Sequence, residues 1–382
     1  MLLWVLLKHV SIVMKNRPKL LCILHRSPPK HGAAKVGDFI ASSKKLKEEY
    51  DCRFITIKSS DTIEDIGKVN FKKFYLVIEL YIKILWALLI FRPNKLYFTA
   101  SIQDVALYRD ILVSTLWKTY RFFTSLDIYY HYHTKGIDKF VSLSSYNLNL
   151  TNFFVRDVNI ILLSPLLKKD IKKLNTYKSI IFLPNGVKNT ILNKDFDAYI
   201  NVKYNKTTSI QILYLAHMMK DKGYLEALEL AYVNKNKNIH FNFAGSWKDS
   251  NSKKEFFAYI KKHKLEKTIT YHGFVSGKQK EELLKNTNIL LYPSKNEAFG
   301  LAIIEALSYG VPVLATNEGS ISYILDNKSG IVISNLEELQ DAFEKIVANF
   351  VNKKTAKYCR ERYLNNFSLE QFENNLTNIL KG

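Results

Sequence analysis

The chain has 382 residues, 47% of them hydrophobic and 24% charged, so it is long enough for two folded domains and unlike a disordered tail or a fibre. Its cysteines, Cys22, Cys52 and Cys359, are far apart and form no CxxC motif, which argues against a disulfide framework or a zinc site and fits a reducing cytoplasm. Lys and Arg number 56 against 35 Asp and Glu, and the resulting formal charge of +21 favours anionic partners such as phosphates, nucleic acid or acidic lipid headgroups without choosing among them.

The N-terminal stretch MLLWVLLKHVSIV is apolar but too short to span a membrane, and no small-residue cleavage site follows it. Because the stretch from Met14 already reads as the start of a buried strand, residues 1–13 are either an upstream extension or a surface anchor. Residues 74–91, FYLVIELYIKILWALLIF, are long enough for a transmembrane helix, but Glu79 and Lys83 lie one turn apart within them. We therefore expect a core helix of an α/β domain here.

Short apolar runs alternate with helical stretches in both halves of the chain. The first half contains the strand candidates LLCILH, RFITI, KLYFT, DIYYHYH, VNIILLS and SIIFLP. The second half contains IQILYLA, IHFNFAG, TITYHGF, NILLYP, VPVLAT and GIVIS. Such alternation indicates parallel sheets covered by helices on both faces. The sequence thus predicts an α/β protein with two Rossmann-like, doubly wound domains facing across a cleft, where ligands bind at the carboxyl ends of the strands.

The domain boundaries follow from a change in composition. We expect an N-terminal domain over residues 1–190, and a C-terminal domain over residues 208–365. Residues 191–207 are polar and rich in Asn and Lys, and we expect them to be the linker. We expect residues 366–382 to form a helix that packs back on the first domain.

The stretch NEAFGLAIIEALSYGVPVLAT places Glu297 and Glu305 eight positions apart around a Phe-Gly pair, directly after a predicted strand. Gly300 allows backbone to approach a ligand, and the amides of Phe299, Gly300 and Leu301 lie at the positive end of the next helix, where a phosphate binds well. Glu297 is placed to accept hydrogen bonds from hydroxyls near that phosphate, and Glu305 is within reach of a neighbouring sugar ring. Alternatively, the first glutamate offsets the helix dipole and the second lies on a solvated face.

This stretch, followed by NEGSISYIL, resembles the E-x7-E signature of retaining GT-B glycosyltransferases, in particular the GT4-like group of glycosyl transferases group 1. QILYLAHMMKDKGYLE, FNFAGS and TITYHGFVSGKQKEELLKNTNILLYPS resemble the next elements of that family. In the first half, SPPKHGAAKVGD, HYHTKG and FLPNGV resemble its acceptor-side loop, its histidine loop and the strand end before the linker. The resemblance extends over nearly the whole chain from Met14.

The resemblance implies roles for individual residues in the second half. Glu297 would contact the donor sugar's hydroxyls, Glu305 the nucleotide's ribose and Lys222 the diphosphate leaving group. His217 stands where the family commonly has a diphosphate-binding arginine; Lys220 could compensate for the missing charge. Alternatively, His217 is merely a packed polar side chain.

In the first half, the resemblance implies that Gly32, in the acceptor-side loop, takes part in donor binding and that His133 is the active-site histidine. Strand alternation would put the side chains of His131 and His133 on the same face of the sheet. The two can point in different directions only if the strand has already given way to the loop. Gly32 and Gly37 have Walker A spacing, but Asp38 replaces the phosphate-gripping lysine, so ATP hydrolysis is not indicated.

Glycosyl transfer passes through an oxocarbenium-like state while negative charge grows on the departing phosphate, so it needs cations and amide donors at the phosphate. Lys222 and the helix N-terminus would supply these, and we expect no metal. The triplet Asp195-Phe196-Asp197 lies in the expected linker, not after an apolar strand, and is a poor metal site.

We therefore expect a retaining glycosyltransferase that needs neither a metal nor a further cofactor. It would move a sugar from a nucleoside-diphosphate sugar, a UDP-sugar, to a hydroxyl group of a lipid-linked or saccharide acceptor. The process would be bacterial surface polysaccharide synthesis. We expect it in the cytoplasm, in peripheral contact with anionic lipid on the inner face of the cell membrane, and without a nucleic-acid partner. One alternative is a nucleotide-sugar epimerase on the same fold, which would need an additional acid/base pair. A basic binding protein without catalysis is another.

Overall fold

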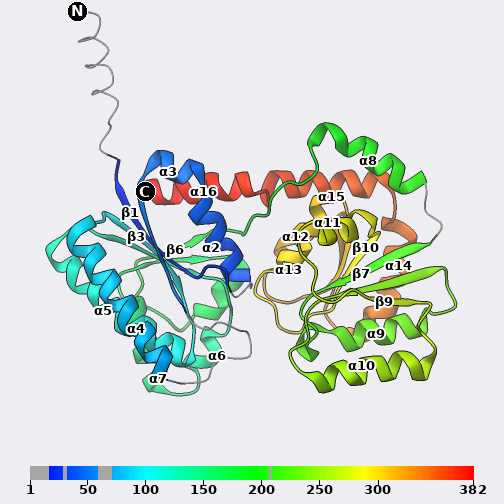
Figure 1. Ribbon diagram of the computed structural model, residues 1–382, viewed down its shortest axis with the longest axis horizontal. Coiled ribbons are helices and arrows are strands. Elements are labelled where there is room, and N and C mark those ends of the chain that lie inside the picture. Colours follow the sequence, from blue (N-terminus) through cyan, green and yellow to red (C-terminus); the bar gives the residue numbers. More distant parts are fainter. Residues whose placement is uncertain (1–16, 29–31, 59–70, 206–208) are drawn as a thin grey trace, which may run out of the picture. The chain divides into compact units, whose positions relative to one another are not determined.

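The computed structural model describes residues 17–28, 32–58, 71–205 and 209–382, so the expectation for residues 1–13 lies outside the described residues (Figure 1). The chain divides into two compact units. Unit 1 takes its described residues from the segments Met1–Leu162, Ile171–Ile181 and Glu373–Gly382, and unit 2 from Leu163–Asp170 and Phe182–Phe372.

Unit 1 contains a six-stranded sheet in the order β2-β1-β3-β4-β5-β6. The strands are β1 (Lys19–Leu24), β2 (Asp51–Thr56), β3 (Lys95–Ala100), β4 (Asp127–Tyr132), β5 (Asn159–Leu162) and β6 (Ser179–Phe182). Strands β1 to β5 pair in parallel. In β1, β3 and β4 every residue after the first is buried, as expected for parallel strands covered on both faces.

The helices of unit 1 are α2 (Gly32–Ser42), α3 (Lys44–Glu49), α4 (Phe71–Trp86), α5 (Asp104–Phe123), α6 (Ile137–Val141) and α7 (Ser145–Val155), with a π-helical turn η2 (Ala87–Phe91) that prolongs α4. The C-terminal helix α16 (Leu369–Lys381) ends beside α3 (Figure 1). There the ammonium of Lys381 donates to Glu49 Oε1 at 2.9 Å, and Lys45 of α3 donates to Asn374 of α16.

The helix over residues 74–91 differs from the expected core helix. Only 22% of the stretch Phe74–Phe91 is buried, although it is long and apolar enough to cross a membrane by length and composition. One side of it, with Leu80 and Ile84, is part of the core of unit 1, and the other side is exposed. Periodicity does not reveal this difference, because both sides of the helix are apolar.

Unit 2 contains a parallel sheet in the order β12-β11-β10-β7-β8-β9. Its strands are β7 (Ile210–Leu215), β8 (Ile239–Ala244), β9 (Ile269–Tyr271), β10 (Ile289–Tyr292), β11 (Val313–Thr316) and β12 (Gly330–Ile333). Numbered from β7, this is the nucleotide-binding order 3-2-1-4-5-6, in which the chain reverses direction across the sheet between the first and fourth strands. That switch point lies between β7 and β10.

The helices of unit 2 are α8 (Asn193–Asn205), α9 (Tyr224–Val233), α10 (Ser250–His263), α11 (Gly277–Asn286), α12 (Leu301–Ser308), α13 (Ile321–Ile324), α14 (Leu339–Phe350) and α15 (Lys353–Asn366), with 3-10 turns η4 (Lys220–Lys222) and η5 (Leu336–Glu338). A further 3-10 turn, η3 (Pro165–Ile171), follows β5. Each of the twelve predicted strands is present among the described residues, and the predicted α/β class with two doubly wound sheets is confirmed.

Residues 193–205 were expected in a polar linker, but they form α8. Phe196 and Ile200 are one turn apart and buried at 6% and 0% exposure, so they give this polar segment one apolar side. The guanidinium of Arg360 in α15 lies over the Phe196 ring at 5.1 Å. Asp197 is on the exposed side of α8, where it pairs with Lys357 at 2.9 Å.

Candidate functional site

The candidate site lies at the switch point of unit 2, where the loops after β7 and β10 meet. The amide of Lys295, in the loop after β10, donates to the carbonyl of Asp221 in η4 at 2.8 Å. The side chain of Ser294 donates to the same carbonyl at 3.4 Å. Carboxyl ends of parallel strands on either side of a switch point form the crevice in which ligands of this architecture bind.

Lys222 and Glu297, which are 75 residues apart in the chain, are in direct contact there. The Lys222 ammonium lies 3.1 Å from Glu297 Oε2, and it also donates to the carbonyl of Asn296. Tyr292 OH donates to the same Glu297 oxygen at 2.6 Å. The other oxygen, Oε1, accepts from the amide of Ala298 at 3.1 Å. The carboxylate is therefore held in one orientation from both sides.

These contacts keep Glu297 ionised although it is nearly buried. Burial raises the pKa of the carboxyl group, but the charge of Lys222 and the hydrogen bonds from Tyr292, Lys222 and Phe299 outweigh burial, so the pKa lies below its ordinary value. Burial, and then the neighbouring Glu297, raise the pKa of Tyr292 well above its usual range. The tyrosine thus remains a hydrogen-bond donor to a carboxylate at neutral pH.

The N-terminus of α12 follows directly. Gly300 has φ +90°, a left-handed conformation that favours glycine, and a Cβ there would lie 2.9 Å from Ile303 Cδ1. The Phe299 amide, expected to be open to a ligand, instead donates to Glu297 Oε1 at 3.3 Å. Within the described part of the chain, the amides of Gly300 and Leu301 donate to no acceptor. These two amides are the donors that the helix terminus offers to an anion.

Glu305 is on the second turn of α12 and only 9% exposed. Its Oε1 accepts a hydrogen bond from the ammonium of Lys280, in α11, at 2.8 Å. The alternative of a solvated glutamate is thus wrong for this residue. The ion pair fixes the second carboxylate of the E-x7-E motif as the first is fixed by Lys222.

His217 lies just after β7, where Nδ1 shares a hydrogen bond of 2.8 Å with Ser246 Oγ. Burial, and then the charge of Lys222, lower its pKa. The imidazole is therefore neutral at pH 7 and does not supply the positive charge of an arginine. Lys220 is exposed. Hydrogen bonds from Ser252 lower the pKa of Asp249, and the charge of Lys220 adds a smaller effect in the same direction.

The candidate residues from the first half of the chain lie in unit 1. Strand β4 ends at Tyr132, yet the rings of His131 and His133 are 4.0 Å apart, so the two histidines are on the same side. His131 is fully buried and bonded through Nδ1 to Tyr97 OH, whereas His133 is only half-buried. His133 is therefore the more accessible of the two. Gly32 is exposed at the start of α2.

Four residues that support the site were not singled out by the sequence reasoning: Tyr292, Lys280, Ser246 and Gly319. Gly319 has φ +56°, and a Cβ there would lie 2.1 Å from the carbonyl oxygen of Glu297, so this close approach of backbones requires glycine. Tyr292 could have been found as the last residue of a strand that leads to Glu297. Lys280 gives no such signal, because it is 25 residues from its partner.

Comparison with solved structures identifies the class of fold. Sucrose-phosphate synthase from Thermosynechococcus elongatus superposes with a TM-score of 0.69 at 16% identity, over 96% of this chain and 98% of that chain. HepE from Anabaena, solved with UDP-glucose, gives 0.69 at 15% identity, over 95% and 99% of the two chains. The chain therefore has the GT-B α/β fold with two parallel six-stranded sheets.

The sequence of unit 2 is similar to a known family. Residues 195–363 match the family model of the glycosyl transferases group 1. An uncharacterized 41.2 kDa protein in the cps region of Klebsiella pneumoniae is 30% identical over 45% of this chain and 46% of its own length. The O-antigen biosynthesis glycosyltransferase WclY of Escherichia coli is 28% identical over 36% and 39%. The chain thus matches less than half the length of these curated relatives.

Proposed function

We propose that this protein is a glycosyltransferase that moves a sugar from a nucleoside diphosphate to a hydroxyl group of a saccharide or lipid-linked acceptor, in the synthesis of a bacterial surface polysaccharide. The observation that carries the proposal is the contact between Lys222 and Glu297 at the switch point of a nucleotide-binding sheet. Support also comes from the family of residues 195–363 and from the relative named for O-antigen biosynthesis.

The geometry suits a departing diphosphate. The Lys222 ammonium and the amides of Gly300 and Leu301 are positive groups in a crevice where they would stabilise charge that grows on the leaving phosphate. Glu297, held by Tyr292, accepts hydrogen bonds from the sugar's hydroxyls, and Glu305 those of the ribose. With this set of donors we propose transfer without a metal.

The finer assignments rest on the resemblance. We assign retention of configuration to the E-x7-E arrangement, a part in donor binding to Gly32, and the position beside the reacting sugar to His133. Lys220 and the neutral His217 would lie beside the diphosphate of the donor. Neither would replace the diphosphate-binding arginine that the family commonly has at position 217. UDP is the proposed nucleotide, because HepE, which shares the fold, was solved with UDP-glucose. The proposed location is the cytoplasm at the inner face of the cell membrane.

The proposal is tested first by ligand binding. A nucleotide that binds only the folded state at a hundred times its dissociation constant stabilises the protein by about 2.7 kcal/mol, which a thermal-shift screen of UDP, GDP and their sugars would detect. We expect Lys222→Met to abolish the shift. As control, Lys237→Met removes a lysine paired with Glu344 at 3.0 Å outside the site, and should leave the shift intact.

Transfer is then measured with the donor found in the screen and a panel of saccharide and lipid-linked acceptors. We expect Glu297→Gln and Lys222→Met to lose transfer while the fold survives. Transfer at the wild-type rate in either variant would contradict the assigned roles. Isomerisation of the donor without an acceptor would indicate the epimerase instead.

A further inference from the structure

The exposed side of α4 and η2 is apolar, the reverse of an ordinary surface helix. Its large side chains point away from the core of unit 1 over five turns. They are Phe74, Tyr75, Ile78, Ile82, Leu85, Trp86, Leu89 and Ile90, each between 39% and 68% exposed. We call these eight side chains the α4 face. A contiguous apolar surface of this kind marks an interaction site.

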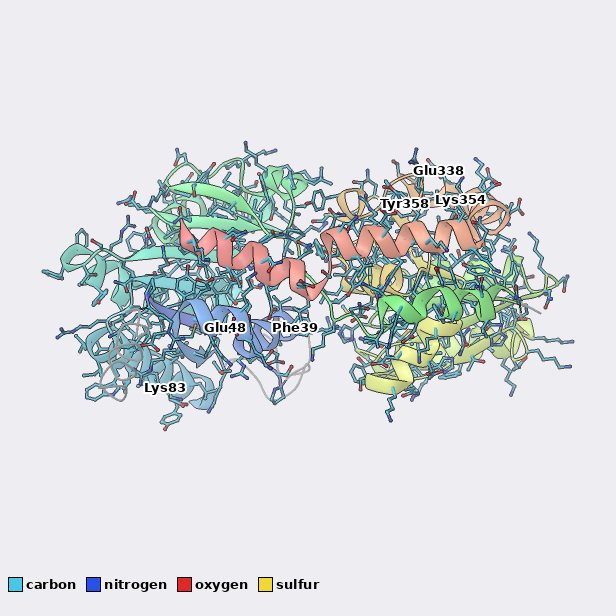
Figure 2. All side chains as sticks on the ribbon, turned by 90° about the horizontal axis from the view of Figure 1, so that it is seen from above. Phe39, Glu48, Lys83, Glu338, Lys354 and Tyr358 are labelled. Carbon is cyan, nitrogen blue, oxygen red and sulfur yellow. The ribbon has the colours of Figure 1, made fainter. Side chains whose placement is uncertain are left out.

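The neighbouring helix α5 also has exposed apolar side chains. α4 and α5 lie side by side in unit 1 (Figure 1). Val105, Tyr108 and Leu112 are spaced for one side of α5 and are 47–51% exposed. Among the residues of α4 whose side chains the structure describes, those with a charge are Glu79 and Lys83, which pair with one another at the border of the α4 face. Figure 2 shows Lys83 on the outer side of unit 1.

We propose that the α4 face binds the surface of an anionic lipid bilayer, with the helix lying in the plane of the interface. This deepens the membrane contact of the proposed function, but it does not depend on sugar transfer. Trp86 and Tyr75 have the amphipathic rings that favour the boundary between headgroups and acyl chains. The apolar residues between them would enter the acyl region.

Charge favours a bilayer over a second copy of the chain. Residues 71–125, which include both helices, contain eight Lys and Arg against three Asp and Glu. Asp110 and Arg109 form a buried pair at 2.6 Å, with side chains that are 0% and 8% exposed, so their charges cancel and seven basic residues remain against two acidic ones. A basic surface attracts anionic headgroups and repels an identical surface.

Packing excludes a spanning orientation of the folded unit. The opposite side of the helix, with Leu80, Ile84, Ala87 and Leu88, is at most 5% exposed within unit 1. To cross a bilayer, the helix would have to leave this core. An interfacial helix keeps the core contact and buries only the exposed side.

The test is sedimentation of the full chain with vesicles, without any nucleotide sugar. We expect binding to vesicles of phosphatidylcholine with 30% phosphatidylglycerol, and weaker binding to phosphatidylcholine alone. The variant Ile82→Gln/Trp86→Gln/Leu89→Gln changes three side chains that are 58%, 61% and 53% exposed, and should lower partitioning at least tenfold with an unchanged thermal midpoint.

A matched control makes the same chemical change in unit 2. The variant Leu192→Gln/Val233→Gln/Phe274→Gln replaces side chains that are 60%, 61% and 52% exposed, and should bind vesicles like the wild type. Since neither variant touches the candidate site, failure of this proposal is distinguishable from failure of the proposed function: thermal shifts with nucleotides should be equal in all three proteins.

Four results would overturn the proposal. The first is equal vesicle binding by the α4-face variant and the wild type. The second is loss of binding on deletion of residues 2–13 while the α4-face variant binds normally. The third is a wild-type dimer without vesicle affinity that the α4-face variant converts to a monomer. The fourth is wild-type protein that alkaline carbonate does not release from vesicles, which would indicate a spanning helix.

Discussion

The hydroxyl group of Tyr292 is the contact whose loss tests the proposed role of Glu297 most selectively. Tyr292→Phe removes one hydrogen bond to a nearly buried carboxylate and leaves the Lys222 ion pair in place. A hydrogen bond to a charged group contributes about 1.5–3 kcal/mol. If the orientation of the carboxylate is used in the transition state, kcat/KM should fall about ten- to a hundredfold.

The same substitution should change the pH dependence. Because the hydrogen bond from Tyr292 lowers the pKa of Glu297, its loss raises that pKa, and the acid limb of kcat/KM should move to higher pH. The assay is the initial rate of sugar transfer, measured from below pH 4.5, the ordinary pKa of a glutamate side chain, up to pH 8. A purely structural role would lower stability but leave this limb in place.

A matched control is available in α15. Tyr358 OH donates to Asp326 Oδ2 at 2.7 Å, so Tyr358→Phe removes the same kind of bond outside the candidate site (Figure 2 labels Tyr358). We expect this variant to keep the wild-type kcat/KM. If Tyr292→Phe also stays within twofold of the wild type, with an unmoved acid limb, the tyrosine does not hold the carboxylate for catalysis.

Three further predictions concern the backbone beside the candidate site, a buried histidine and a buried arginine. Gly319→Ala should reduce nucleotide binding and lower the unfolding free energy by more than about 1 kcal/mol, because the new Cβ would press on the Glu297 backbone. The control Gly277→Ala also has a positive φ, +53°, but its Cβ would have no atom within 4 Å, so this variant should keep wild-type nucleotide binding. Burial and then His133 hold the pKa of His131 well below its ordinary value. The free energy of unfolding in urea should therefore be greatest above about pH 6.5 and fall at lower pH by up to about 1.4 kcal/mol per pH unit. His131→Gln should reduce this slope, and an equal slope in both proteins would contradict the prediction. Arg360→Met should lower the unfolding free energy by about 3 kcal/mol or more, because it leaves the buried carbonyl oxygens of Ser308 and Ile191 unpaired. A loss below about 1 kcal/mol would show that water replaces the guanidinium.

The sequence determined the strands and the central residues of the candidate site. Buried parallel strands are short apolar runs between helices, a local pattern that needs no knowledge of the partner strand. Glu297 and Glu305 could be recognised because they share one loop and helix with Gly300. Lys222 was found by resemblance, and not by any spacing that relates it to Glu297.

The remaining features depend on contacts between distant segments, which tertiary structure alone decides. The strand order brings the loop after β7 against the loop after β10, so that Lys222 meets Glu297 and Lys280 meets Glu305. The same holds for the helix over residues 74–91, which is apolar on both sides. Hydrophobicity gives the tendency of each side chain to leave water, but only the packed fold shows which side the protein covers and which side remains exposed.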